Sequence, residues 1–175
     1  QFNFFVLSSN SWPLNTKVHE GFISKRVCDL QKEYTDYYNT KNSRKVLKWH
    51  LPFCTAEINF KKLNVVLEVN GVQCAILNLF NNKDNYICTS ENNNNNSKSI
   101  SFKKILDATF LDKDIIMNSL NYLVNGCNLL KVDKDIYSIN EEVTFNKSIV
   151  CINDFSNKKE VKVIFLLVFN IFLFF

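Results

Sequence analysis

The chain has 175 residues, of which 46% are hydrophobic and 22% are charged, and its formal net charge is +4 at pH 7. This length and apolar content suit one ordinary domain or two very small ones with a real core, and they exclude disorder over most of the chain. With 3 Gly and 2 Pro, collagen-like and proline-rich classes are excluded as well. The mild positive charge does not by itself indicate nucleic acid, which requires basic residues clustered on one face.

Apolar periodicity predicts the elements of the first seventy residues. Alternating or helically spaced apolar residues predict a strand at 2–6, a helix at 23–38, and strands at 46–49, 56–60 and 63–69. Lys61 and Lys62 are expected to form a hairpin turn between the last two strands. Each of these strands is apolar on one face only, so one side of the sheet should meet a core and the other side water.

Helices dominate the prediction for the next part of the chain. Asn70 and Gly71 end the preceding strand and begin a helix at 72–80, and the polar stretch 81–99 is expected to be a disordered insertion. Ser101 should cap a short helix that ends near residue 108, and Asp112 should cap a further helix that ends before Gly126. A hairpin at 129–139 follows. Three helices and then a hairpin is the order of elements in a winged helix.

These elements divide the chain into three parts. An α/β sheet region at 1–70 is followed by a winged-helix region at 71–153 that contains the insertion 81–99, so the expected fold class is α+β. The remaining part, 154–175, is an apolar tail. Its residues 163–175 are apolar except Asn170, and 13 residues fall short of the roughly 20 that a membrane-spanning helix needs. A buried strand, a buried helix and an artefact of gene prediction remain open for this tail.

No catalytic or metal-binding motif stands out. Serine-nucleophile, phosphate-loop and zinc-protease motifs are absent, and no two of the six cysteines form a C-x-x-C pair. We therefore expect reduced, mostly buried thiols in an intracellular protein, with no catalytic residue, metal or cofactor. The predicted recognition helix of the winged-helix region carries Lys113 as its only cation, which argues against nucleic-acid binding.

Six short motifs, in order, resemble the cullin homology domain of the cullin family. They are VLSSNSWP at 6–13, an aromatic-containing helix at 30–38, RKVLKW at 44–49, VQCAILNLF at 72–80, SFKKI at 101–105 followed by 120–130, and IYSINE at 136–141. The first motif and the stretch 55–80 look most like the cullin-like subunit 2 of the anaphase-promoting complex. The sequence departs from the family where Pro52, Phe53 and Cys54 replace the usual step after Trp49.

The resemblance implies a non-catalytic scaffold, a fragment of a multisubunit cullin-RING-type ubiquitin ligase that acts in protein degradation and cell-cycle control. Its implied partners are a small RING subunit, through it a ubiquitin-conjugating enzyme, and other ligase subunits, in the nucleus and cytoplasm. The RING subunit would add a strand to the α/β sheet. The implied contact residues are Trp49, Thr55, Glu57, Ile58, Asn59, Phe60, Val65 and Leu67. Two alternatives stay open: a winged-helix nucleic-acid-binding protein, and a protein anchored in a membrane by its apolar tail.

Overall fold

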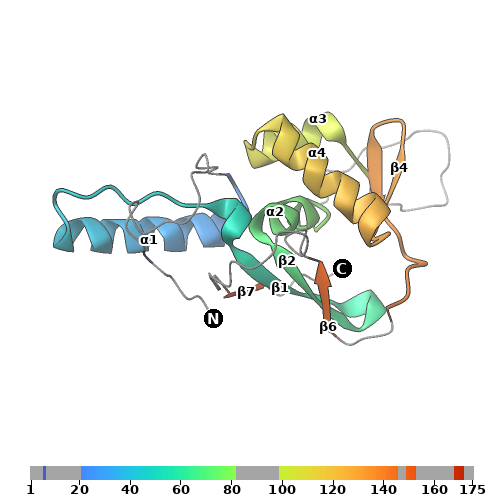
Figure 1. The fold of residues 1–175 in the computed structure, drawn as a ribbon, viewed down its shortest axis with the longest axis horizontal. Coiled ribbons are helices and arrows are strands. Elements are labelled where there is room, and N and C mark those ends of the chain that lie inside the picture. Colours follow the sequence, from blue (N-terminus) through green and yellow to red (C-terminus); the bar gives the residue numbers. More distant parts are fainter. Residues whose placement is uncertain (1–5, 7–20, 82–98, 146–148, 153–167, 172–175) are drawn as a thin grey trace, which may run out of the picture.

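A computed structural model describes residue 6 and residues 21–81, 99–145, 149–152 and 168–171. This part of the chain has an α+β fold with four α-helices and two small sheets (Figure 1). The helices are α1 (Lys25–Lys41), α2 (Gly71–Leu79), α3 (Phe102–Thr109) and α4 (Lys113–Asn121). The strands are β1 (Thr55–Phe60), β2 (Val65–Asn70), β3 (Ser99–Ser101), β4 (Leu130–Asp133), β5 (Ile136–Ile139), β6 (Ile149–Ile152) and β7 (Val168–Ile171).

The first sheet is built on the antiparallel hairpin β1–β2, in the order β6-β2-β1-β7. The hairpin runs in register from Thr55 opposite Asn70 to Phe60 opposite Val65. Its two outer neighbours, β6 and β7, are both parallel to the strands they flank. The predicted hairpin is confirmed, although the connection is a short 3-10 turn, η3 (Lys61–Leu63), and Asn64 takes the left-handed conformation with φ 51°. Asparagine tolerates this conformation better than most residues.

The hairpin buries one face, as the alternating sequence predicts. Every second side chain of β1 is buried, and Glu57, between two of them, is exposed. Val65, Leu67 and Val69 of β2 are buried in the same way. Because opposite residues of an antiparallel pair share a face, the two strands present one continuous apolar surface.

Helix α2 lies at the centre of the molecule, between the first sheet and the pair α3–α4 (Figure 1). Asn70 Oδ1 accepts a hydrogen bond from Gln73 N at 2.9 Å, and Gln73 Oε1 accepts one from Asn70 N at 3.0 Å. This reciprocal capping box fixes the start of the helix directly after β2. All residues of α2 except Asn78 are buried. A helix that is apolar all round is typical of a core element, and here it joins both halves of the chain in one hydrophobic cluster.

The second sheet is antiparallel, in the order β3-β5-β4; β3 precedes α3 in the chain, and β4 and β5 follow α4. Ser101 caps α3, as predicted, because its hydroxyl accepts a hydrogen bond from Lys104 N at 3.2 Å. Helix α4 begins after Asp112 and passes into a π-turn, η5 (Tyr122–Gly126), so the helical stretch ends at the predicted glycine. The predicted β4–β5 hairpin is also present. Strand β3 was not predicted, and a winged-helix unit over 71–153 stays a prediction.

Helix α1 projects away from the rest of the molecule, and residues 42–50 run back beside it (Figure 1). Among its residues only Val27 is fully buried. Trp49 lies against this helix: its indole N–H donates to Thr35 Oγ1 at 3.2 Å, and its ring meets Tyr34 edge-on at 6.1 Å between centroids. The strand predicted at 46–49 is therefore wrong. Val46 is 83% exposed there, because the tryptophan packs on a helix instead of completing a sheet.

The remaining expectations concern the polar insertion, the first predicted strand and the apolar tail. Of the insertion predicted at 81–99, residues 82–98 lie outside the part of the chain that the structure describes, and Ser99 belongs to β3 instead. Most of the strand predicted at 2–6 also lies outside the described residues. Ile149–Ile152, at the end of the predicted second region, joins the first sheet as β6. Within the apolar tail, Val168–Ile171 forms a strand, one of the possibilities that the sequence leaves open. Among the described residues, no helix has both the length and the apolar character needed to cross a membrane.

Candidate functional site

The sheet residues predicted to contact a partner separate onto the two faces of the β1–β2 hairpin. Ile58, Phe60, Val65 and Leu67 lie in the core and are at most 6% exposed. Thr55, Glu57 and Asn59 lie on the opposite face, where Glu57 is exposed and the other two are partly exposed. Trp49 is not on the sheet at all. The structure therefore brings together seven of the eight predicted residues on one hairpin, and only the three on the outer face present side chains to a surface.

Backbone geometry decides which main-chain groups of β1 point outward. Gly71 N donates to Cys54 O at 2.8 Å, just beyond the first pair of the ladder. Opposite residues in an antiparallel ladder alternate between hydrogen-bonded and non-hydrogen-bonded pairs. With Cys54 and Gly71 on the hydrogen-bonded side, the pairs that contain Ala56, Ile58 and Phe60 are bonded to β2. The N–H and C=O groups of Thr55, Glu57 and Asn59 therefore face the outer edge of β1.

The same alternation applies to the outer edge of β2. Glu68 is opposite Glu57 and Val66 is opposite Asn59, so their main-chain groups face away from β1. β7 flanks the first edge and β6 the second, in each case over four residues. Such an edge binds an extended segment through main-chain hydrogen bonds, with little demand on the side chains of that segment.

The resemblance implies a main-chain contact with a partner strand, but the sequence does not show which main-chain groups face outward. The implied contact residues include the buried Ile58, Phe60, Val65 and Leu67, whereas the main-chain groups that face outward belong to the residues that alternate with them. One sequence signal bears on this pattern. Asn70–Gly71 marks the end of β2, and the end of the strand sets which residue pairs of the β1–β2 ladder are hydrogen-bonded. The flanking strands could not be placed in the same way, because no sequence feature of 149–152 or 168–171 indicates which strand lies beside it in the sheet.

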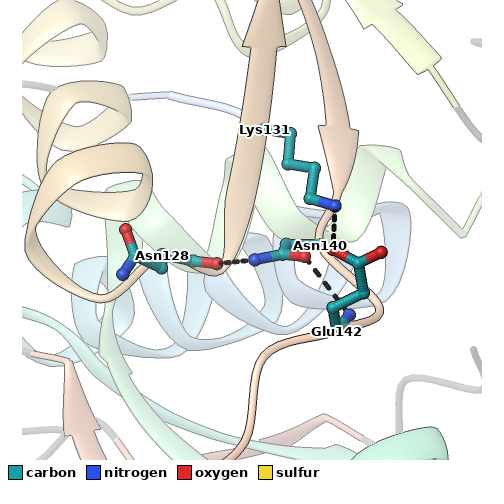
Figure 2. Close-up of polar contacts among 4 residues, drawn as sticks. All are labelled: Asn128, Lys131, Asn140 and Glu142. Carbon is teal, nitrogen blue, oxygen red and sulfur yellow. Dashed lines mark hydrogen bonds and ion pairs between the residues drawn. The ribbon is translucent and has the colours of Figure 1, made fainter.

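A second group of polar residues lies at the base of the β4–β5 hairpin (Figure 2). Asn140 Nδ2 donates to Asn128 O at 2.8 Å, and Asn140 Oδ1 accepts from Glu142 N at 3.2 Å. The Lys131 ammonium donates to the Glu142 carboxylate, and this bond lowers the pKa of Glu142 below its usual value. Because the carboxylate is fully exposed, solvent screens the ion pair, and the pair stabilises the hairpin only weakly. The group closes a turn and contains no reactive side chain.

Two of the described cysteines, Cys54 and Cys74, are buried and unreactive. Burial raises the pKa of Cys54 to about 12, with a smaller contribution from neighbouring Cys74, and burial raises the pKa of Cys74 to about 12 as well. The thiolate is the reactive form of cysteine, so these two side chains remain protonated. Among the described residues, no group of three His, Cys, Asp or Glu side chains is placed to hold a metal ion.

Alkylation by iodoacetamide at pH 8, mapped by mass spectrometry, should therefore distinguish the cysteines. Cys54 and Cys74 are expected to remain unmodified in the native protein and to react only in denaturant. Cys28 and Cys127 are each partly exposed, and they should react earlier although burial raises the pKa of both. Rapid modification of Cys54 in the native state would show that the segment between η2 (Leu51–Phe53) and β1 opens readily.

The fold and the candidate site define an α+β protein whose first sheet is built on the β1–β2 hairpin and whose described residues form no metal site. The sequence matches the family described as the cullin alpha+beta domain over residues 6–149. Since this match covers most of the chain, the protein belongs to the cullin family. Cullin domains of this kind are scaffold domains and are in general non-catalytic.

A curated relative agrees with the family assignment. The chain is 32% identical over 83 residues to the protein named Cullin-4 of Dictyostelium discoideum. The aligned part is 46% of this chain and 10% of that relative. The chain thus spans about a tenth of the curated cullin that it matches.

Proposed function

We propose that this chain is a scaffold segment of a cullin-RING ubiquitin ligase, which holds a small RING subunit that in turn recruits a ubiquitin-conjugating enzyme. The observation that carries the proposal is the match to the cullin alpha+beta domain over residues 6–149, which includes the whole β1–β2 hairpin. A scaffold of this kind accelerates transfer by bringing enzyme and substrate together, without a catalytic group of its own. The nucleus and the cytoplasm are the proposed compartments.

The β1–β2 hairpin is the proposed contact surface for the RING subunit. Its core face is covered by α2, so Ile58, Phe60 and their buried neighbours support the sheet instead of touching the partner. The outward main-chain groups of β1 and β2 are suited to a strand of the partner. Trp49 acts at a distance from this surface, by fixing residues 42–50 against α1.

A winged-helix unit is proposed for residues 71–153, beside the α/β region at 1–70. The order α2, β3, α3, α4, β4 and β5, together with the antiparallel sheet β3-β5-β4, supports it. We assign this unit to contacts with other ligase subunits. Helix α4 begins with Lys113 and Asp114 and carries no other cation, which leaves it unable to neutralise several phosphates.

The anaphase-promoting complex is the branch of the family that we propose, on the resemblance of residues 55–80 to its cullin-like subunit 2. The likeness to Cullin-4 supports the general cullin branch instead. Purification of the tagged chain from its own cells separates the two, because the large multisubunit complex and a smaller cullin assembly differ in their co-purifying subunits.

Co-purification of a RING subunit with edge variants tests the proposed contact. Glu57→Pro and Glu68→Pro each remove one outward N–H, at the β1 edge and the β2 edge respectively. We expect at least one of these proline variants to lose the RING subunit. Glu57→Ala and Glu68→Ala keep the N–H groups and change the same exposed or partly exposed side chains, so they should retain it.

Circular dichroism and thermal melting establish which variants are folded before the comparison is made. Loss of the partner from both alanine variants as well would show that side chains, not the backbone, form the contact. Retention of the partner by every folded proline variant would place the interface away from this sheet. Absence of any RING subunit from the wild-type purification would contradict the proposed function itself.

A further inference from the structure

Strand β7 lies against the outer edge of β1, the edge to which Thr55, Glu57 and Asn59 direct their main-chain groups. The pairing is parallel and runs from Thr55 opposite Val168 to Ile58 opposite Ile171. We propose that this edge is a strand-exchange site, which β7 fills within the chain and which an extended, mainly apolar segment of a partner fills in its place.

The β1 edge is formed independently of β7. Six residue pairs join β1 to β2, and the alternate side chains of β1 are fixed in the core that α2 covers. Removing β7 breaks the four pairings on the outer side of β1 and none of those that join β1 to β2. The N–H and C=O groups of Thr55, Glu57 and Asn59 would then be exposed in the extended geometry that strand addition requires.

The β7 edge is a better candidate for exchange than the β6 edge. Nine residues, 140–148, join β5 to β6, whereas fifteen residues, 153–167, join β6 to β7. The departure of β6 would therefore pull on the β4–β5 hairpin through a short connection. Strand β6 pairs with β2 and not with β7, so the departure of β7 breaks no pairing of β6. The sequence of β7, Val-Phe-Asn-Ile, also shows the chemistry of the occupant: an extended segment with apolar residues and no charge.

When β7 occupies the β1 edge, the apparent affinity of this edge for a partner segment falls. The measured dissociation constant rises in inverse proportion to the fraction of molecules in which the edge is open. If β7 fills the edge in nine-tenths or more of the molecules, opening it should tighten binding at least about tenfold. The identification of the external occupant as the RING subunit rests on the proposed function, whereas the exchange itself does not.

Two proline variants of the chain, one that opens the edge and one that serves as its control, test the proposal. In a parallel pair, the β7 residues opposite Ala56 and Ile58 direct their main-chain groups toward β1. Those residues are Phe169 and Ile171. Phe169→Pro removes an N–H that faces β1 and should release β7. Asn170→Pro removes one that faces away, where a strand at an edge tolerates proline, and it serves as the matched control.

The probe is a fluorescent peptide with the sequence of residues 165–173, whose binding is followed by anisotropy. We expect the Phe169→Pro variant to bind this peptide at least tenfold more tightly than the wild type or Asn170→Pro. Equal binding to all three proteins would overturn the proposal. If Phe169→Pro does not fold, replacement of Val168–Ile171 by Gly and Ser residues gives the same test.

The RING subunit that co-purifies with the wild type is then measured against the same variants. Tighter binding to Phe169→Pro than to Asn170→Pro would support exchange with that partner. Equal binding of the RING subunit to both would leave the proposed function standing and overturn its competition with β7. Peptide binding that responds to Phe169→Pro, in a chain for which no RING subunit is found, would support strand exchange and contradict the proposed function.

Discussion

Replacement of Ile58 by alanine is expected to lower the free energy of unfolding by about 2–5 kcal/mol, the cost of removing a large aliphatic side chain from a packed core. Ile58 is 0% exposed. It lies at the middle of β1, where its side chain belongs to the core face that the sheet shares with α2. Urea denaturation followed by circular dichroism measures the change, as a shift of the midpoint at constant slope.

The neighbouring Glu57 provides the matched control for this substitution. It belongs to the same strand and has its side chain on the opposite, exposed face. Glu57→Ala should change stability by no more than about 0.5 kcal/mol, the usual range for surface positions. Similar losses for Ile58→Ala and Glu57→Ala would mean that β1 is not buried on the side where α2 lies.

Gly71→Ala is expected to destabilise the protein by about 1–3 kcal/mol, the usual cost of forcing extra volume into a packed interior. A Cβ at this position would lie 2.4 Å from Leu51 O and 3.0 Å from Cys54 Cβ. The first of these atoms belongs to the backbone, so a side-chain rotation cannot relieve the clash. Either η2 must move or α2 must begin farther from it.

Gly126→Ala is the comparison that separates this clash from a general effect of glycine. A Cβ at Gly126 would meet the Tyr122 ring at 2.8 Å, and a ring that is only partly buried can turn aside. We therefore expect a smaller loss than at Gly71, measured in the same urea titration. An equal loss at both positions would show that the contact with Leu51 O does not set the effect at Gly71, because exchanging glycine for alanine lowers the entropy of the unfolded chain and by itself stabilises.

Local chemistry made much of the fold predictable. The β1–β2 hairpin followed from alternation of apolar residues, α3 from the Ser101 cap, and the β4–β5 hairpin from two short apolar runs around a polar turn. At that turn Lys134 and Asp135 both have positive φ, 44° and 67°, the conformation that a two-residue hairpin turn needs. In each case neighbouring residues along the chain carry the information.

Tertiary contacts explain where the sequence misled. Val46 and Trp49 have the spacing of a strand, yet the hydrogen bond from the indole to Thr35 and the contact with Tyr34 hold this segment on α1. Strand β3 has three residues beside a polar stretch, and it exists because Ile100 pairs opposite Tyr137. The local sequence pattern does not predict either contact, because the two partners of each contact are distant in the chain.

The candidate site was predictable to a similar degree. The strands that form it were predicted, and the resemblance to cullins implies a strand contact with a partner, which stays a prediction. Only the register of the β1–β2 ladder shows which residues of β1 are bonded to β2 and which direct their main-chain groups outward. The pairing of β6 and β7 with the two outer edges could not be predicted from local sequence, because it joins segments that are far apart in the chain.

The position of β6 and β7 in the chain has a consequence for synthesis on the ribosome. The β1–β2 hairpin and α2 emerge together, since residues 55–79 are contiguous, and their contacts close short loops. The two flanking strands are made about eighty to a hundred residues later. Contacts so distant in sequence form slowly, because loop closure must precede any gain from pairing. A nascent chain therefore carries a sheet with two open edges, and during this interval it is exposed to mispairing with other chains and available to chaperones.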